Sequence, residues 1–325
     1  MALTGTGTTI AAMLIVIPGA LPPAAVAPEL ARLLPQHAPT LHGWLRAAPA
    51  RSQAFDAARE GCTPFEAWQL EQAGYQPQPG LPLGAGLGPL RAGGGAPGQP
   101  VWLADLAHLA LGADQAALLD PALLDLRADE SAQLFEAAAP LFADSGFGAT
   151  PVDAARWRLT LPAGMAPQTA SPAAVAGQRL RAWWSQDAAM RPWRRLLNEI
   201  QMVWYEHPVN EARAARGAAP INALWLYGGA APWPPRTPAP ARVCDELAAP
   251  QRAGDWAAWL DALAALDAAQ LAPLAGPHGR PAQPLQLLLL GDDRRAALTL
   301  KPRAGLARWL PAPKHNWNAW WSRPV

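Results

Sequence analysis

The chain has 325 residues, of which 51% are hydrophobic and 16% charged, and its formal net charge is +1. This composition excludes an intrinsically disordered chain, and the small net charge provides no overall field that would attract nucleic acid or an anionic membrane. The two cysteines, Cys62 and Cys244, have no zinc-site spacing and are too few for a disulfide framework. No apolar run is long enough to span a membrane, and the run at 10–17 lacks a basic flank and a cleavage site, so we expect a cytoplasmic protein.

The N-terminal segment reads as the start of an α/β core. Residues 9–17 are typical of a buried strand, and Pro18-Gly19 predicts a turn at its end. Short helical patterns follow at 28–34 and 52–60. Thr63 and Glu66 then predict a capping box at the start of a further helix.

Residues 76–100 are rich in glycine and proline. We expect an exposed loop here and the main internal boundary of the chain. The glycines are not expected to hold a phosphate, because neither a lysine nor a helix start follows them.

The next segment alternates strands and helices. Strands are predicted at 101–111, 117–120 and 156–161, with a helix capped by Asp129 between the second and the third. His108 lies in an apolar run, and we expect it to be a packed, hydrogen-bonded histidine and not a ligand.

The stretch 191–230 carries polar residues at spacings that packing alone does not require. Its apolar positions predict a long helix that ends at His207, because Pro208 disfavours helical geometry in the residue before it. Asn210 is predicted to cap a second, short helix, and Gly217 to end that helix in a left-handed conformation. A buried strand at 221–227 should follow, with a tight glycine turn after it.

The same stretch, NEIQMVWYEHPVNEARAARGAAPINALWLYGG, resembles the signature of the RpfE-type regulatory proteins of proteobacteria, which are often labelled phosphoglycerate mutase. It also resembles a segment of the archaeal-type cofactor-independent phosphoglycerate mutases of the alkaline phosphatase superfamily. The residues that carry this second resemblance are His207, Pro208, Val209, Asn210, Arg213, Gly217, Pro220, Asn222 and Gly228-Gly229.

The resemblance implies a two-metal phosphoryl-transfer site, but the sequence lacks the ligands for one. Such a site needs clustered Asp and His side chains around two metals. Pro18-Gly19 stands where the superfamily places a metal-binding aspartate, and none of the six histidines lies in a pattern such as HxxGxDxxxH. We therefore expect no metal site, no cofactor and no mutase activity.

The C-terminal part predicts a proline-rich connector at 231–242, a helix around 256–263 and a hairpin of strands at 285–290 and 296–300. The tryptophan-rich tail is expected either to pack on the body of the protein or to contact a partner.

We predict a mixed α/β (α+β) fold, with sheets flanked by helices, that resembles a degenerate alkaline phosphatase fold with an α+β insert. Residues 1–100 and 231–325 should form its core, and residues 101–230 the unit that carries the signature.

We predict that six side chains form one partly buried polar cluster: Asn198, Glu199, His207, Asn210, Arg213 and Asn222. The cluster would brace the helix–helix–strand joint, or it would bind an anion through Arg213. Arg216 shares a helix face with Arg213 and is a weaker candidate.

The sequence leaves two functions open. One is a non-catalytic regulatory protein that binds a small anionic, phosphorylated metabolite or a protein partner. The other is a metal-dependent phosphoryl-transfer enzyme with a rearranged site.

Overall fold

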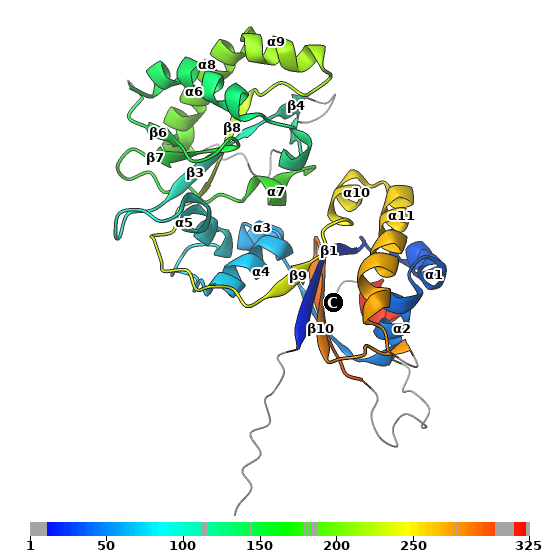
Figure 1. The fold of residues 1–325 in the computed structure, drawn as a ribbon. Helices are drawn as coiled ribbons and strands as arrows, with labels where there is room; N and C mark the ends of the chain where they lie inside the picture. The colour runs from blue at the N-terminus through cyan, green and yellow to red at the C-terminus, as the bar shows by residue number, and fades with distance from the viewer. Residues whose placement is uncertain are drawn as a thin grey trace, which may run out of the picture. The chain divides into compact units, whose positions relative to one another are not determined.

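The structure is a computed structural model that describes residues 12–111, 116–143, 145–178, 180, 183, 187–276, 279–302 and 315–322. The chain divides into two compact units (Figure 1): unit 1 comprises Met1–Phe55 and Ala239–Val325, and unit 2 comprises Asp56–Pro238. The sequence suggested boundaries near 100 and 230, whereas the contacts place them near 56 and 238. Among the described residues, no helix has the length and apolar character needed to cross a membrane.

Unit 1 is built on a five-stranded sheet with the order β2-β11-β10-β1-β9. The strands are β1 (Met13–Leu21), β2 (Ala50–Ala54), β9 (Ala241–Val243), β10 (Leu285–Gly291) and β11 (Arg294–Leu300). β1 pairs in parallel with β9 and β10, while β11 lies between β10 and β2 and is antiparallel to both. The predicted hairpin between β10 and β11 is therefore confirmed.

Among the described residues of unit 1, four helices contribute side chains to its core: α1 (Ala27–His37), α2 (Pro39–Ala47), α11 (Trp256–Leu266) and α12 (Asn318–Trp321). They cover the sheet face that carries alternating residues such as Ile15, Ile17 and Leu287, as period-2 strands require. Trp321 of α12 is almost fully buried in this core, and its carbonyl oxygen accepts a hydrogen bond from Arg294. Residues 315–322, the described part of the tail, therefore pack on the body of unit 1 (Figure 1).

Two predictions for the first 60 residues are wrong. β1 does not turn at Pro18-Gly19 but runs on to Leu21, with a shift of register after Pro18. Gly19 has φ +81°, and a Cβ there would lie 2.6 Å from the Leu247 carbonyl carbon, so glycine allows the irregular strand to pass close to the next segment. The predicted helix at 52–60 is instead strand β2 followed by α3 (Ala57–Glu60), whose start is capped by Asp56.

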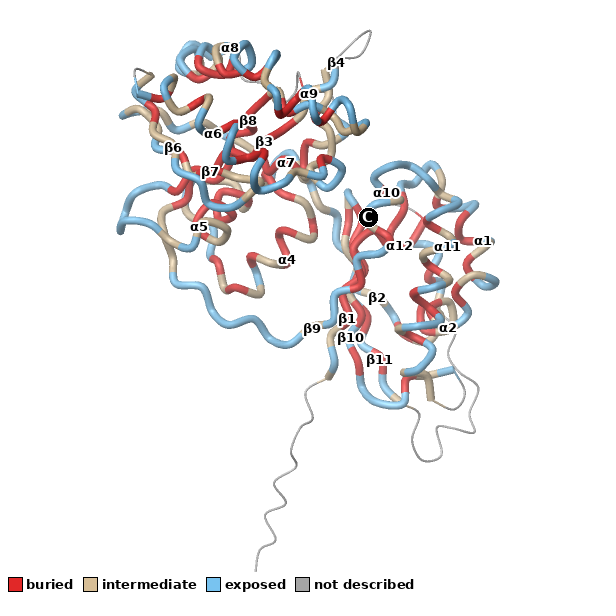
Figure 2. The backbone as a smooth tube through the Cα atoms, turned by 45° about the horizontal axis from the view of Figure 1, so that its top comes forward, coloured by how far each residue is buried: buried red, intermediate tan, exposed pale blue. Residues whose placement is uncertain are grey.

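Unit 2 is built on an antiparallel sheet with the order β6-β7-β3-β8. Its strands are β3 (Trp102–Ala107), β6 (Gly148–Pro151), β7 (Arg156–Thr160) and β8 (Ala223–Gly228), and β4 (Leu109–Leu111) pairs separately with β5 (Ala116–Leu118). Figure 2 shows that β3 and β8 are buried.

Both faces of this sheet are covered. One face packs against α6 (Ala128–Ala143) and α8 (Arg191–Tyr205), which supply most of the helical side chains of the unit-2 core. The opposite side carries α4 (Pro64–Ala73), η1 (Leu83–Gly86), α5 (Leu87–Ala92) and α7 (Pro172–Val175). The capping box of Thr63 and Glu66 at the start of α4 is confirmed, as is the mixed α/β fold with helices that flank the sheets.

The glycine- and proline-rich segment at 76–100 is not simply an exposed loop, and this prediction is wrong. Its centre folds into η1 and α5, in which residues 84–89 are buried. A Cβ on Gly84 would lie 2.1 Å from the Gly61 carbonyl oxygen, and one on Gly88 would lie 2.1 Å from the Val101 carbonyl oxygen. These glycines therefore allow backbone segments to pack closely, which explains a composition that otherwise resembles a linker.

Candidate functional site

The signature stretch folds as α8, then α9 (Pro208–Ala215), then β8, so the predicted order helix–helix–strand is confirmed. α9 is capped by His207, whose Nδ1 accepts the Val209 N–H at 3.2 Å, and not by Asn210 as predicted. The reason is that Pro208 itself begins the helix, since a proline is tolerated in the first turn. Gly217 adopts φ +75°, as predicted.

Asn210 holds the end of α8 and the approach to β8 together. Its amide nitrogen donates to the carbonyl oxygens of Trp204 and Ile221, both at 2.8 Å, and its Oδ1 accepts the Ile221 N–H at 2.7 Å. A buried amide with three backbone partners braces the joint between these segments.

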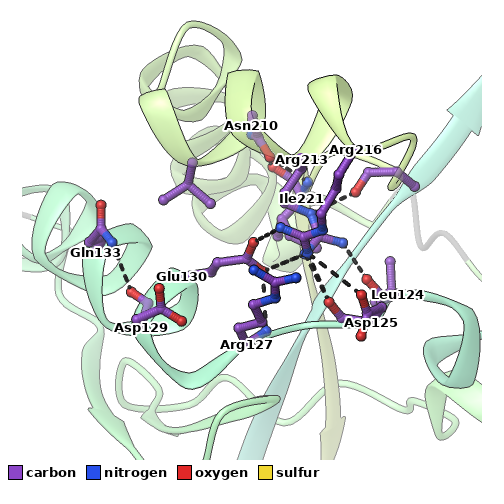
Figure 3. Close-up of polar contacts among 12 residues, drawn as sticks. Leu124, Asp125, Arg127, Asp129, Glu130, Gln133, Asn210, Arg213, Arg216 and Ile221 are labelled. Carbon is purple, nitrogen blue, oxygen red and sulfur yellow. Dashed lines mark hydrogen bonds and ion pairs between the residues drawn. The ribbon is translucent and has the colours of Figure 1, made fainter.

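Arg213 is fully buried and is the centre of a second set of contacts (Figure 3). Its Nε donates to the Ala219 carbonyl oxygen at 2.8 Å, and its terminal nitrogens donate to the carbonyl oxygens of Leu124 and Asp125. The Nη1 atom also lies 2.6 Å from Oε2 of Glu130, at the start of α6. Every nitrogen of the guanidinium therefore has a partner within the protein.

Arg216, the residue that follows α9, pairs with the other oxygen of Glu130, so a single buried carboxylate holds both arginines (Figure 3). Burial alone would raise the pKa of Glu130. Hydrogen bonds from Arg216, the Arg127 N–H and Arg213 outweigh burial and lower this pKa to about 2. The ion-paired cluster of Glu130, Arg213 and Arg216 therefore fastens α9 to α6, and the structure supports bracing as its role.

The six predicted side chains do not form one cluster. Asn198 is exposed and Glu199 pairs with Arg195 at 2.9 Å, both on the part of α8 that turns away from the core. Asn222 instead bonds the backbone N–H and C=O of Leu109 at 2.7 and 3.0 Å. The prediction was wrong because polar residues close in sequence were assigned to one site, although α8, α9 and the residue before β8 direct them to different neighbours.

A cavity of about 400 Å³ lies elsewhere in unit 2, between α8, α3, residues 168–170 and one edge of β8. Its apolar walls include Trp183, Trp193 and Trp225, and the charged side chains among its described lining residues are Arg59 and Arg194. The Oγ1 atom of Thr169, another lining residue, is buried and has no hydrogen-bond partner. Tryptophan walls with two arginines and an unsatisfied hydroxyl suit a ligand that combines apolar surface with negative charge.

Sequence reasoning missed this cavity because its lining residues come from segments that are far apart in the sequence, from 58–59 to 224–226. The one local signal is the pair Trp193-Arg194, which places a cation next to an aromatic residue within α8. The ring of Trp193 also packs inside the unit, 5.5 Å from that of Phe147.

A second polar network crosses the sheet face that α4 and α5 cover. Tyr227 donates to Oδ1 of Asp105 at 2.9 Å and accepts from Arg91 at 3.2 Å, and Arg91 pairs with Glu66 at 2.6 Å. Burial raises the pKa of Asp105 to about 6, and the charges of Arg156 and Arg91 and the hydrogen bond from Tyr227 offset only part of this effect. The network connects buried polar groups of β3, β8, α4 and α5.

Metal-ligating side chains do not converge in the part of the chain that the structure describes: no group of three or more His, Cys, Asp and Glu residues is placed to hold a metal ion. Cys62 and Cys244 are free thiols. Burial raises the pKa of both, to about 11 for Cys244. The carbonyl oxygen of Pro220 can only accept, so Nδ1 of His108 donates a hydrogen bond to it at 2.7 Å.

No protein-family model matches this sequence, and no curated protein matches it. Five chains of solved structures are similar in fold, among them the following two. The cofactor-independent phosphoglycerate mutase from Thermoplasma acidophilum is 13% identical, with 95% of this chain and 94% of that chain covered at a TM-score of 0.34. The PH0037 protein from Pyrococcus horikoshii is 11% identical, with 89% of this chain and 87% of that chain covered at a TM-score of 0.38.

Proposed function

We propose that this chain is a non-catalytic regulatory protein of the RpfE type that acts by binding an anionic ligand in the cavity of unit 2. The observation that carries the proposal is the lining of the cavity, which combines three tryptophans with Arg59 and Arg194. Its volume of about 400 Å³ lies within the usual range for ligand sites, roughly 300–1,000 Å³. We propose a cytoplasmic location on the sequence grounds given above.

The arginines of the signature are not the ligand-binding groups in this proposal. Arg213 is fully buried and bonded to Glu130 and to backbone carbonyls, so an anion would have to displace internal partners. Arg59, in contrast, has a largely exposed side chain at the cavity. The signature positions α8 and β8, which form two walls of the cavity, and so contributes to binding indirectly.

The test is a thermal-shift titration of the full chain with phosphorylated three-carbon acids and with a short acidic peptide, acetyl-triglutamate amide. A ligand that binds only the folded state raises the melting temperature in proportion to the logarithm of its excess over Kd. We expect at least one of these anions to raise the melting temperature of the protein. Arg194→Gln should raise the apparent Kd of that anion about tenfold, as expected for the loss of one charge-assisted hydrogen bond.

Arg195→Gln is the matched control, because Arg195 neighbours Arg194 on α8 but pairs with Glu199 outside the cavity. This variant should keep the full ligand-induced gain. The proposal is contradicted if no anion of the set stabilises the protein, or if the two variants lose the gain equally.

A further inference from the structure

The cavity runs along the edge of β8 that β3 does not cover. Among the described residues, the sheet order gives β8 a single neighbour, yet three consecutive residues, Leu224, Trp225 and Leu226, line the cavity. Side chains alternate between the two faces of a strand, so three consecutive residues border one cavity only where it follows the strand edge. The cavity therefore offers backbone groups of β8 as well as side chains.

The hydrogen bonds of β3 determine which backbone groups of β8 face the cavity. The Leu106 N–H donates to the Ala155 carbonyl on the β7 side of β3. Bonding direction alternates along an antiparallel strand, so the preceding residue, Asp105, bonds toward β8, where it lies opposite Trp225. The N–H and C=O groups of the two leucines on either side of Trp225 consequently point away from β3, toward the cavity.

Two N–H and two C=O groups spaced in this way form the pattern that an extended peptide pairs with when it adds a strand to a sheet edge. We propose that the cavity binds an extended acidic peptide segment of a partner protein, which adds to β8 as the next strand of the unit-2 sheet. This inference rests on the binding function proposed above and specifies the class of ligand.

The cavity walls indicate the side chains that such a segment would carry. On one face of the sheet, Leu224 and Leu226 share a core with Trp193, which lies next to Arg194. On the other face, the Trp225 indole donates to the Ala170 carbonyl at 2.9 Å, and Arg59 is among the lining residues. Successive peptide side chains would alternate between these faces. Each face offers apolar surface and one arginine, so two adjacent carboxylates flanked by apolar residues provide complementary charge.

The experiment uses a pool of acetylated and amidated hexapeptides with two central glutamates and valine, isoleucine or phenylalanine at the other positions. Binding to the full chain is measured by calorimetry, and the tightest member is resynthesised with N-methyl groups on one or the other alternate set of backbone nitrogens. We expect methylation of one set to weaken binding about 100-fold, about tenfold for each of two hydrogen bonds, and methylation of the other set to leave it unchanged. The proposal is overturned if both sets behave alike, or if no peptide binds with a Kd below about 1 mM.

A protein variant provides an independent test. Leu226→Pro removes an N–H that faces the cavity but no hydrogen bond to β3. The variant should bind the peptide about tenfold more weakly. If a phosphorylated acid still raises the melting temperature of the variant, the cavity is intact. Binding of phosphorylated acids without peptide binding would refute the strand-addition inference alone. If neither ligand binds, the proposed function fails as well.

Discussion

Replacement of Arg213 by alanine tests the role that the structure assigns to the signature. The substitution removes hydrogen bonds to three backbone carbonyls and the buried ion pair with Glu130. Breaking a buried pair from one side costs about 3–5 kcal/mol, because the remaining charge stays buried. Glu130 keeps Arg216 and the Arg127 N–H as partners, so we expect a loss near the lower end, about 3 kcal/mol.

Urea unfolding at pH 7, followed by tryptophan fluorescence, measures this loss. The control is Arg195→Ala, which breaks an exposed pair with Glu199 and should cost no more than about 0.5 kcal/mol. The pH dependence supplies a second check. A carboxylate with a lowered pKa stabilises the fold above its ordinary pKa of 4.5, and this contribution disappears as the pH falls toward about 2. The difference in free energy of unfolding between the wild type and Arg213→Ala should therefore become smaller below pH 4.5. A loss under about 1 kcal/mol at pH 7 would refute the bracing role.

Three further predictions concern the polar network, the glycines and the chemistry. Asp105 has a raised pKa of about 6, so the folded state binds an extra proton between pH 3.8 and 6, and the free energy of unfolding falls as the pH rises through this window. Asp105→Asn should make the free energy of unfolding, measured with urea at each pH, less dependent on pH in this window. An unchanged pH dependence in the variant would contradict this prediction. Gly84→Ala should destabilise unit 2 by about 2 kcal/mol or more, because its Cβ would overlap the Gly61 carbonyl. Gly148→Ala, where the nearest atom is 3.4 Å away, should cost far less in the same unfolding assay. The purified protein should show no phosphoglycerate mutase activity in a coupled assay, and turnover that a chelator abolishes would contradict this.

The elements that could be predicted were those whose signals are local. The capping box of Thr63 and Glu66, the helix break at Pro208 and the alternating strand at 156–160 depend on residues within a few positions of one another. These patterns express hydrogen bonding and burial that each segment satisfies largely by itself.

The errors arose where distant segments decide the outcome. The glycines at 84 and 88 resemble linker glycines until the carbonyls of Gly61 and Val101 are placed against them. Arg213 resembles an anion-binding residue until Glu130, 83 positions earlier, is placed beside it. The cavity was missed for the same reason, because α3, residues 168–170, α8 and β8 meet only in the folded unit.

The most direct test of the proposed binding site is hydrogen-exchange mass spectrometry of the full chain with and without the tightest anionic ligand. Exchange reports the protection of individual backbone segments, and binding in the cavity should slow it where ligand and protein meet. The account predicts new protection in Ala223–Gly228, with smaller effects at 168–170 and 190–194, and no change around Arg213. Protection at α9 around Arg213 with none in β8 would contradict it, because the ligand would then occupy the signature and not the cavity.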